Sequence, residues 1–428
     1  MTTSRLQRRM DGKRILLTGG RAPAALDLAR QLAANGHQIF MAESCPEHLC
    51  RQSRAIQRCY FVPEPALNTK AYVEALRQII EEEQIEWLLP MCEELFYVAG
   101  GLSELSSHCR VFAEPLDRLR RLHSKWEFNQ RVEQVGLSVP KTMLLQSRQD
   151  CLAFMESEAE QAKLRQQETG KTDAAKWVFK PVFSRFSSKV IIAEVTADGW
   201  RSHSRIISDL PVSDDAHWVV QQYIDGAAYC SYSIVHQGTI TAHTVYPVRF
   251  TAGLGACVSF ESVRHPEIDR WVERFVQEES FTGQIAFDFI EAGDGTVYPL
   301  ECNPRATSGI HLFRAEDRLD QALFMMGIQQ QSEQERIMPQ LGRRAMITVA
   351  LASYGLATLL SAGGWRRFPD WIRFFMRGSD VVFRLRDPQP FWQQFRLVYW
   401  NWRKGMKQRI PIIEASTQDI EWNGGEMG

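Results

Sequence analysis

The beginning of the chain alternates between short apolar runs and segments with apolar residues at helical spacing. Arg14 to Thr18 is a predicted strand, and Ala24 to Asn35 is a predicted helix with one apolar face. His37 to Met41 is the next predicted strand. The alternation continues through a strand near Cys59–Val62, a helix at Thr69–Glu83 and a strand at Trp87–Pro90. This pattern predicts a β-α-β start and a small α/β domain over residues 1–115.

The middle of the chain combines one long helical pattern with several strand patterns. Leu116 to Val139 is a predicted helix. Residues 156–176 lose apolar periodicity in their second half, which predicts a helix end followed by a surface loop. The other predicted elements are a strand–loop–strand unit at Trp177–Val195, a strand at Trp218–Ile224, a hairpin of Tyr229–Val235 with Thr239–Val245, and helices at Glu267–Glu279 and Asp317–Met326.

One hairpin, within residues 282–313, has polar and apolar residues on opposite faces. Asp294 and Gly295 predict a two-residue turn, because glycine adopts a positive φ without steric cost. Folding the chain there sets Asp288 opposite Glu301, and Asn303 opposite Ala286. The other face pairs Phe287 with Cys302, Phe289 with Leu300, and Glu291 with Tyr298.

The polar face of this hairpin predicts a metal site. Directly opposed residues have Cβ atoms about 4.5–5.5 Å apart, so Asp288 and Glu301 repel each other unless a cation lies between them. Carboxylate and amide oxygens are hard ligands, which indicates Mg²⁺ rather than Zn²⁺. Arg305 adds a fixed positive charge. The alternative is a solvent-facing strand pair with incidental acids, but the register and the apolar back face independently favour the metal site.

The string Glu301-Cys302-Asn303-Pro304-Arg305, with Asp288 upstream, resembles the metal-binding hairpin of the ATP-grasp superfamily. That group includes biotin carboxylase, carbamoyl phosphate synthetase and D-Ala–D-Ala ligase. The resemblance implies that Asp288, Glu301 and Asn303 hold Mg²⁺ (or Mn²⁺) on the phosphates of ATP. It also implies that Arg305 is the catalytic residue that stabilises the transferred phosphoryl group or an acyl-phosphate intermediate.

The same resemblance assigns two lysines to the nucleotide. Lys125 precedes the string Gly136 to Pro140 by about ten residues, a spacing at which relatives carry a lysine on the α-phosphate. Lys180, at the end of the strand WVFKPV, corresponds to the lysine on the α- and β-phosphates. The alternatives are a surface lysine on an amphipathic helix and an edge-strand lysine.

The chain departs from the family in its phosphate loop and hinge. The loop at residues 184–189 has no glycine, Phe186 hinders close backbone approach, and Arg185 or Lys189 supplies charge instead. Ala228 stands where relatives carry a ribose-binding acid, so ribose contacts stay unassigned. The hinge whose backbone reads adenine corresponds to Gln221, Gln222, Tyr223 and Ile224.

Two arginines precede the predicted helix at Glu267–Glu279 and are candidate substrate ligands. Arg249 and Arg264 lie in a glycine-containing segment that we expect near the open side of the site. Arginine grips a carboxylate in a bidentate manner, so each is a candidate clamp for a substrate carboxylate. Surface salt bridges are the equally weighted alternative.

Composition narrows the class of protein. The 428 residues are 44% hydrophobic and carry a net charge of −1, as expected for a soluble globular protein without a nucleic-acid partner. The nine cysteines form no CxxC pair, which indicates reduced thiols and a cytoplasmic location. The longest uncharged run, Ala345 to Trp365, contains Thr, Ser, Tyr and Gly, which argues against a transmembrane helix.

The segment from residue 363 to residue 409 holds eleven Arg or Lys, three Asp and twelve aromatic residues. A mix of basic and aromatic residues is typical of a peripheral membrane surface or of a face for an anionic partner. It is also typical of a helical cap with snorkelling arginines, which we favour here.

Together these features predict an ATP-grasp fold with three parts. They are a Rossmann-like pre-ATP-grasp domain (1–115), the ATP-grasp core (116–330) and a mixed or helical C-terminal extension (331–428). The predicted activity is an ADP-forming ligase that activates a small-molecule carboxylate as an acyl phosphate for an amine or another nucleophile. The alternatives are an ATP-binding regulator, a carboxylase or phosphotransferase on the same core, and a dehydrogenase. The sequence GGRAPA lacks the third glycine of a dinucleotide fingerprint, which argues against the last. The oligomeric state stays open.

Overall fold

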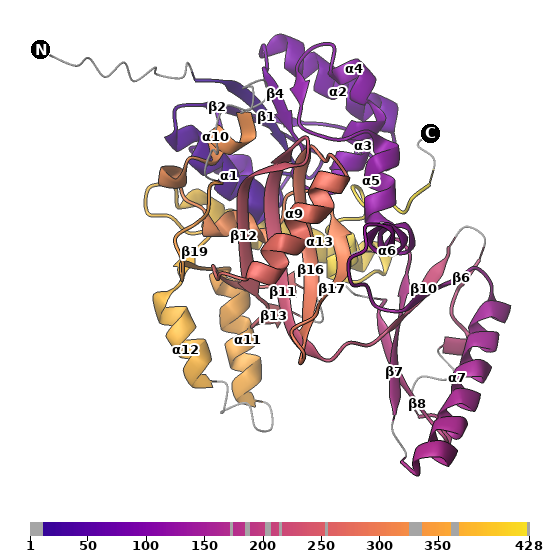
Figure 1. Cartoon of the computed structure of the whole chain (residues 1–428). Coiled ribbons are helices and arrows are strands. Elements are labelled where there is room, and N and C mark those ends of the chain that lie inside the picture. The colour runs from indigo at the N-terminus through magenta and orange to yellow at the C-terminus, as the bar shows by residue number, and fades with distance from the viewer. Residues whose placement is uncertain are drawn as a thin grey trace, which may run out of the picture.

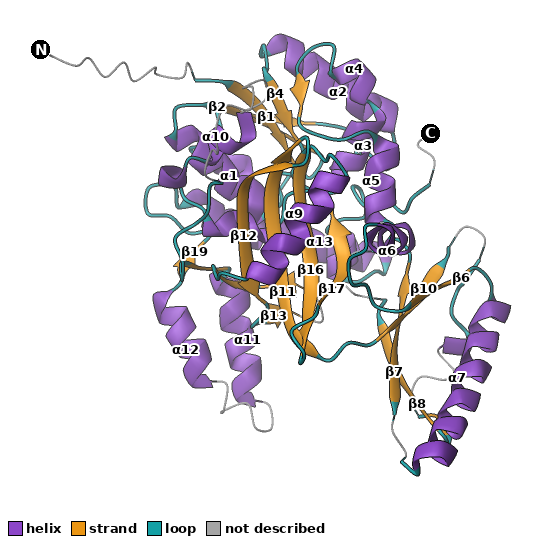
Figure 2. Ribbon diagram, in the orientation of Figure 1, coloured by secondary structure: helices purple, strands orange, loops and turns teal. Residues whose placement is uncertain are grey.

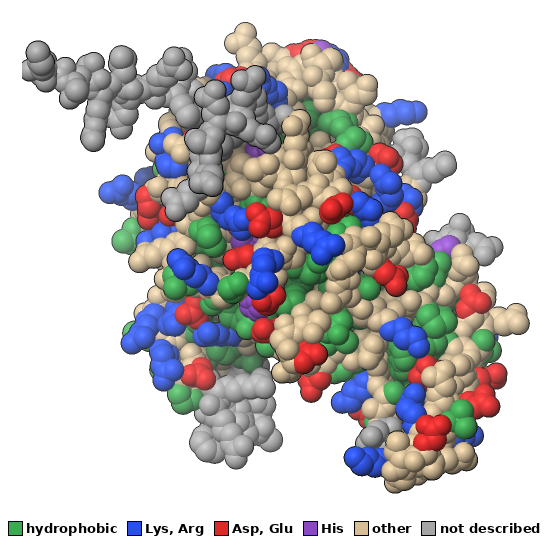
Figure 3. Space-filling model, in the orientation of Figure 1, with side chains coloured by type: hydrophobic (Ala, Val, Ile, Leu, Met, Phe, Trp, Pro, Cys, Tyr) green, Lys and Arg blue, Asp and Glu red, His purple; other side chains and the backbone are tan. Residues whose placement is uncertain are grey.

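The computed structural model (Figures 1 and 2) describes residues 12–171, 174–184, 189–201, 207–213, 216–252, 256–324, 336–360 and 368–425. The predictions for Arg185 and Phe186 lie outside these residues, as does the end of the predicted helix at Asp317–Met326. Acidic and basic side chains are interspersed on the face shown in Figure 3, in keeping with the net charge near zero.

A parallel sheet of order β3-β2-β1-β4-β5 forms the N-terminal part, drawn in indigo and violet in Figure 1. The three central strands are almost entirely buried, which suits a parallel sheet between helices, whereas the two edge strands are partly exposed. The strands are β1 (Arg14–Thr18), β2 (Gln38–Glu43), β3 (Arg58–Phe61), β4 (Trp87–Leu89) and β5 (Arg110–Val111). The helices are α1 (Pro23–Ala34), η1 (Leu49–Gln52), α2 (Thr69–Glu82), α3 (Glu94–Gly100) and α4 (Leu102–Leu105).

The predicted long helix at Leu116–Val139 is wrong, because the structure has two helices there. They are α5 (Leu116–His123) and α6 (Lys125–Gln134). Ser124 adopts an extended conformation and its hydroxyl accepts a hydrogen bond from Glu127 N (3.2 Å), so it caps a new helix. This break places Lys125 at the first position of α6.

A second sheet, of order β6-β10-β7-β8-β9, projects from the body and is covered on one face by α7 (Figure 2). Its strands are β6 (Thr142–Leu145), β7 (Ala175–Pro181), β8 (Ile191–Thr196), β9 (Gly199–Trp200) and β10 (Trp218–Gln222). Helix α7 runs from Arg148 to Thr169, so it ends in the second half of residues 156–176, where a helix end was predicted. A capping box at Ser147 and Asp150 and the left-handed Gly170 (φ 67°) set its two ends.

The third sheet, of order β12-β11-β16-β17, carries helix α9 on one face and forms the centre of the molecule (Figures 1 and 2). Phe287 and Phe289 of β16 are fully buried against Trp271 and Phe275 of α9. This aromatic layer fixes which face of β16 turns away from α9. The elements are β11 (Gly226–His236), β12 (Thr239–Pro247), α9 (Pro266–Glu278), β16 (Gly283–Ala292) and β17 (Val297–Asn303).

The register of β16 and β17 confirms the predicted pairs near the polar residues and corrects those near the turn. Asp288 pairs with Glu301 and Ala286 with Asn303, but Phe289 pairs with Pro299 and Glu291 with Val297. The loop is longer than two residues, since Gly295 N donates to Ala292 O and Ala292 N donates to Thr296 O. A bulge at Leu300 then restores the predicted register.

The C-terminal strands β18 and β19 join β15 from the middle of the chain in a small sheet, and helices make up most of the rest of the C-terminal part. None of the helices among the described residues is long and apolar enough to cross a membrane. The remaining elements are β13 (Thr251–Ala252), β14 (Ala256–Cys257), β15 (Ser259–Glu261), η2 (Ser308–Leu312), η3 (Ala315–Asp317), α10 (Leu319–Phe324), β18 (Arg344–Met346), α11 (Thr348–Leu360), α12 (Phe368–Arg377), β19 (Ser379–Asp380), α13 (Gln389–Gln408) and α14 (Ile412–Ala415).

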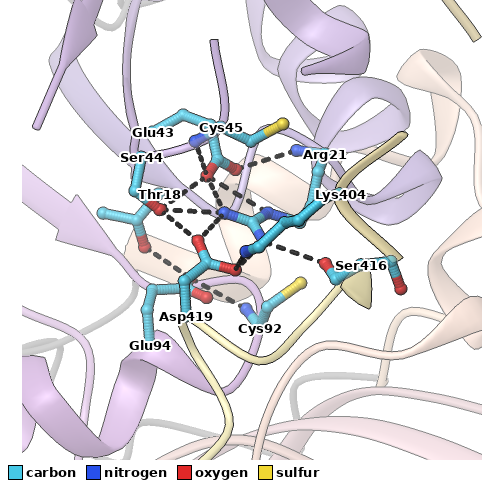
Figure 4. A network of polar contacts seen from close by, with 10 residues as sticks. All are labelled: Thr18, Arg21, Glu43, Ser44, Cys45, Cys92, Glu94, Lys404, Ser416 and Asp419. Atoms are coloured by element: carbon cyan, nitrogen blue, oxygen red, sulfur yellow. Dashed lines mark hydrogen bonds and ion pairs between the residues drawn. The ribbon is translucent and has the colours of Figure 1, made fainter. Parts of the chain in front are cut away.

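The tail after α14 returns to the carboxyl ends of β1 and β2 (Figure 4). Asp419 accepts hydrogen bonds from the Arg21 guanidinium (2.6 and 2.7 Å) and from Ser44 Oγ (2.7 Å). Burial acts to raise the pKa of Asp419, but Arg21 outweighs it and lowers that pKa to about 2. Further along, the Trp422 ring stacks on Phe96 with centroids 4.8 Å apart. The tail therefore covers the edge of the sheet at which an open α/β sheet usually binds ligands.

Candidate active site

The centre of the candidate site is the pair of opposed carboxylates on β16 and β17. Burial first, and then the neighbouring Glu301 carboxylate, raise the pKa of Asp288 to about 7. Burial also acts to raise the pKa of Glu301, but Lys125 outweighs it and, together with a hydrogen bond from Asp288 and with Lys180, lowers it to about 2. The two acids therefore cannot both ionise at low cost near neutral pH unless further positive charge is added.

Asn303 and Arg305 extend this polar face beyond the end of β17. Asn303 Nδ2 donates to Glu301 Oε1 (3.3 Å), and Arg305 Nη2 donates to Asn303 Oδ1 (3.0 Å). The Arg305 guanidinium also lies 3.5 Å from the carboxylate of Glu93, and its side chain is 15% exposed. Two carboxylates and an amide oxygen with a free second lone pair are a donor set suited to Mg²⁺.

Lys125 reaches this face from the N-terminus of α6. Its Nζ is 3.8 Å from Glu301 Oε2 and donates to Ser184 O (3.2 Å) and Ser184 Oγ (3.1 Å). Burial lowers the pKa of Lys125, and the nearby carboxylates of Glu301 and Glu93 oppose that shift. Lys125 thus connects Ser184, the first residue of the predicted phosphate loop, to Glu301 on β17.

Lys180 approaches the same face from β7. Its Nζ donates to Gln221 Oε1 (2.9 Å) and to the carbonyl of Leu300 (3.0 Å), the residue at the bulge. Burial, with a contribution from Lys125, lowers the pKa of Lys180 to about 8. The bulge therefore has a local purpose, because it turns a strand carbonyl toward a buried ammonium group.

The predicted hinge residues lie where β10 ends, and they divide into two groups. Gln221 is buried, its side chain accepts a hydrogen bond from Lys180, and its backbone pairs with Thr142 and Val178 in the sheet. The amides of Gln222 and Tyr223 already donate to Lys141 O (2.8 Å) and Lys176 O (3.0 Å). Adenine recognition by this hinge stays a prediction, and it would use the carbonyl groups or the Ile224 amide.

The two candidate substrate arginines are not in contact with this cluster. Arg249 Nη1 lies 2.8 Å from Glu261 Oε2 and its side chain is 48% exposed, so it forms the surface ion pair given as the alternative. Arg264 is exposed, and it forms no ion pair with any of the described residues. Their role toward a substrate carboxylate stays a prediction.

Two further residues near the cluster were given no site role from the sequence. Glu93 contacts Arg305, and the signal for it was its position directly after the strand Trp87–Leu89. His123 is buried beside Phe96 and Phe183 (ring centroids 4.9 and 5.8 Å apart), and burial lowers its pKa to about 4. Trp422 completes this aromatic box against Phe183 (5.8 Å). The C-terminal tail therefore supports the residue before Ser184.

Comparison with known proteins identifies the fold. No protein-family model and no curated protein sequence matches the chain. An L-amino acid ligase structure from Bacillus licheniformis is 14% identical, covers 73% of this chain and 75% of its own, and gives a TM-score of 0.53. An N5-carboxyaminoimidazole synthetase from Staphylococcus aureus, complexed with ADP, is 12% identical, covers 80% and 84%, and gives 0.56.

A third similar solved structure contains a magnesium nucleotide. It is the biotin carboxylase domain of Hydrogenobacter thermophilus 2-oxoglutarate carboxylase with MgADP, ADP and bicarbonate, 14% identical over 69% of this chain and 64% of its own, with a TM-score of 0.50. These neighbours have the ATP-grasp fold, and the protein has the same fold. The predicted fold class and the resemblance are thus confirmed, whereas the roles of individual residues stay predictions.

Proposed function

We propose that the protein is an ATP-dependent ligase that converts a small-molecule carboxylate to an acyl phosphate. An amine or another nucleophile then displaces phosphate. The observation that carries this proposal is the convergence of Asp288 and Glu301 with two buried lysines and Arg305 on one face. The clustering of these charges is costly to the fold unless a ligand with both a cation and anions fills the site.

The donor set fits a magnesium ion on the phosphates of ATP. Asp288, Glu301 and Asn303 would hold it, and when bound it would neutralise charge on the phosphate oxygens and orient them. Lys180 and Lys125 would pair with the remaining phosphate charge. Gln221 and the Leu300 carbonyl act as positioning groups, because they hold Lys180 Nζ at 2.9 and 3.0 Å.

The reaction requires positioning and charge stabilisation rather than a protein nucleophile. A substrate carboxylate oxygen attacks the γ-phosphorus, the bond from that phosphorus to the β-phosphate oxygen breaks, and ADP leaves. The nucleophile's lone pair then forms a bond to the acyl carbon, the carbon–oxygen bond to phosphate breaks, and one proton is released. Arg305 faces the transferred phosphoryl group, where its guanidinium offsets developing negative charge.

Product analysis with substrate panels tests this proposal. Purified protein with Mg-ATP is expected to release ADP and phosphate only when a suitable carboxylic acid and amine are both present, and mass spectrometry should show the condensed product. Glu301→Gln should abolish this turnover, and Glu291→Gln on the same hairpin is the matched control. ATP binding without ADP release across the panels would instead support a regulatory protein.

Carboxylation is the second candidate, because the solved neighbours include a carboxyaminoimidazole synthetase and a biotin carboxylase domain. In that reaction bicarbonate takes the place of the organic carboxylate. Labelled bicarbonate incorporated into an amine acceptor, with ADP release that depends on bicarbonate, would favour a carboxylase over a ligase for organic acids.

A further inference from the structure

Helix α13 has a buried face and an uncovered face. It runs for 20 residues from Gln389 to Gln408 and packs on η1 and α14. Pro390, Gln393 and Gly405 are buried on the inner side. The inner face therefore packs on the N-terminal part of the chain and on α14, and the outer face needs a separate explanation.

The outer face carries a stripe of large apolar side chains. Residues at i, i+3, i+7, i+10 and i+14 share one side of a helix. The five residues at these positions are between 46% and 65% exposed, namely Trp392, Phe395, Tyr399, Trp402 and Met406. Over these 14 intervals a helix rises about 21 Å, so the stripe is a long and continuous apolar surface. Single exposed apolar residues need no explanation, but a contiguous patch of this kind indicates a binding surface.

A basic stripe runs beside the apolar one. It consists of Arg396, Arg403 and Lys407, which are exposed and form no ion pair with the residues that the structure describes. From residue 388 to residue 413 the sequence contains no Asp or Glu, so nothing on this segment neutralises these cations. The face thus combines apolar bulk with uncompensated positive charge.

The apolar and basic stripes together indicate which kind of partner binds this face of α13. A second copy of the chain packed through the same face would bring Arg396, Arg403 and Lys407 toward their own equivalents, without an acid on either helix. A single-stranded nucleic acid needs a groove along which its backbone runs, whereas this face is one convex helix that also carries aliphatic Met406 and Val398. Trp and Tyr beside Arg and Lys are the residues that line the interface of a bilayer.

We propose that α13 is an interfacial helix that docks the protein onto an anionic phospholipid bilayer. The apolar stripe enters the boundary between headgroups and acyl chains, and the basic stripe lies against the lipid phosphates. The helix lies in the plane of the surface and does not cross the bilayer. This inference is independent of the proposed ligase activity.

Vesicle sedimentation with the full chain tests the proposal. The protein should bind vesicles of phosphatidylcholine with phosphatidylglycerol and should not bind phosphatidylcholine alone. The triple variant Arg396→Glu, Arg403→Glu and Lys407→Glu should lower the partition coefficient by about a hundredfold or more, since each basic residue near an anionic surface contributes several-fold. The double variant Trp392→Ser and Trp402→Ser should lose binding as well.

Controls distinguish binding through the outer face of α13 from effects of any charge or polarity change and from unfolding. Lys163→Glu with Leu164→Ser on α7 changes an exposed basic residue and a half-exposed apolar one elsewhere, and it should bind as the original protein does. Circular dichroism melts check the fold, and quenching of wild-type tryptophan by brominated lipid reports insertion without any substitution.

Three results would overturn the proposal. One is binding to anionic vesicles that the charge reversal leaves unchanged. The second is no vesicle binding together with salt-sensitive binding of a single-stranded oligonucleotide through the same residues. The third is no vesicle binding together with self-association that the tryptophan substitutions abolish.

Discussion

Replacing Asp288 with Asn should stabilise the ligand-free protein at neutral and alkaline pH while removing its response to magnesium. Burial and Glu301 raise the pKa of Asp288 to about 7, compared with a value of 3.8 when unperturbed. For an acid whose pKa is higher in the folded state, the contribution to stability is complete below the unfolded value and is lost as pH rises to the folded value. The loss therefore occurs between about pH 4 and pH 7.

The size of the effect follows from the pKa difference. A shift of about three units corresponds to an upper limit of about 4 kcal/mol at pH 8, because each unit is worth 1.36 kcal/mol. Ionised Glu301 stabilises the folded state, which is the opposite of the effect of Asp288. Because its pKa falls from 4.5 to about 2, its contribution to the free energy of unfolding changes at lower pH. Lys180, with a pKa of about 8, changes charge above this window. Of these three groups, Asp288 therefore makes the largest contribution to the change in unfolding free energy between about pH 4 and pH 7.

Urea unfolding of the ligand-free proteins at pH 4, 6 and 8 measures this difference. Asp288→Asn should match the original protein at pH 4 and exceed it by about 2–4 kcal/mol at pH 8. Mg-ADP should stabilise the original protein only. Asp294→Asn, exposed in the loop of the same hairpin, is the control and should follow the original protein. A variant that is equally destabilised at every pH would refute the reasoning, since its loss would then arise from packing.

Three further substitutions test the site. Glu301→Gln should lower kcat for ADP release by about 10²-fold or more, and an unchanged kcat in a coupled assay would remove Glu301 from the metal set. Lys180→Met should raise the KM for ATP at least about tenfold, whereas Lys176→Met, 46% exposed on the same strand, should not; equal effects would contradict a phosphate role. Trp422→Ala should cost about 3 kcal/mol of unfolding free energy in a thermal or urea melt and reduce turnover, and a loss below about 0.5 kcal/mol would show that the tail does not support Phe183.

The register of the predicted metal ligands could be predicted from the sequence because strand periodicity fixes which side chains share a face. The prediction of Asp288 opposite Glu301 is confirmed, although the assumed turn was too short. The longer loop shifts the register by one residue, and the bulge at Leu300 shifts it back. Pro299 beside Leu300 is compatible with a bulge on an edge strand, but the interaction that the bulge serves is with Lys180 on another sheet, which the local sequence does not indicate.

Errors in the helices have a similar origin. Ser124 interrupts an otherwise continuous helical pattern, since its hydroxyl can cap the helix that follows. Other features depend on contacts between segments far apart in the chain. Examples are the hydrogen bond from Lys180 to the Gln221 side chain and the ion pair of Glu93 with Arg305. The packing of Trp422 beside Phe96 and Phe183 is of the same kind. Local patterns contain no information on such contacts.

The contacts of the C-terminal tail with the N-terminal sheet can form only late in translation. A ribosome makes Arg21 and the strands around it long before it makes Asp419 and Trp422, and N-terminal units generally fold first. During that interval the sheet edge lacks its acidic partner and the ring beside Phe183 is missing. Nascent chains interrupted before residue 419 would therefore lack both the acidic partner of Arg21 and the ring beside Phe183, so the N-terminal sheet would first fold without these contacts.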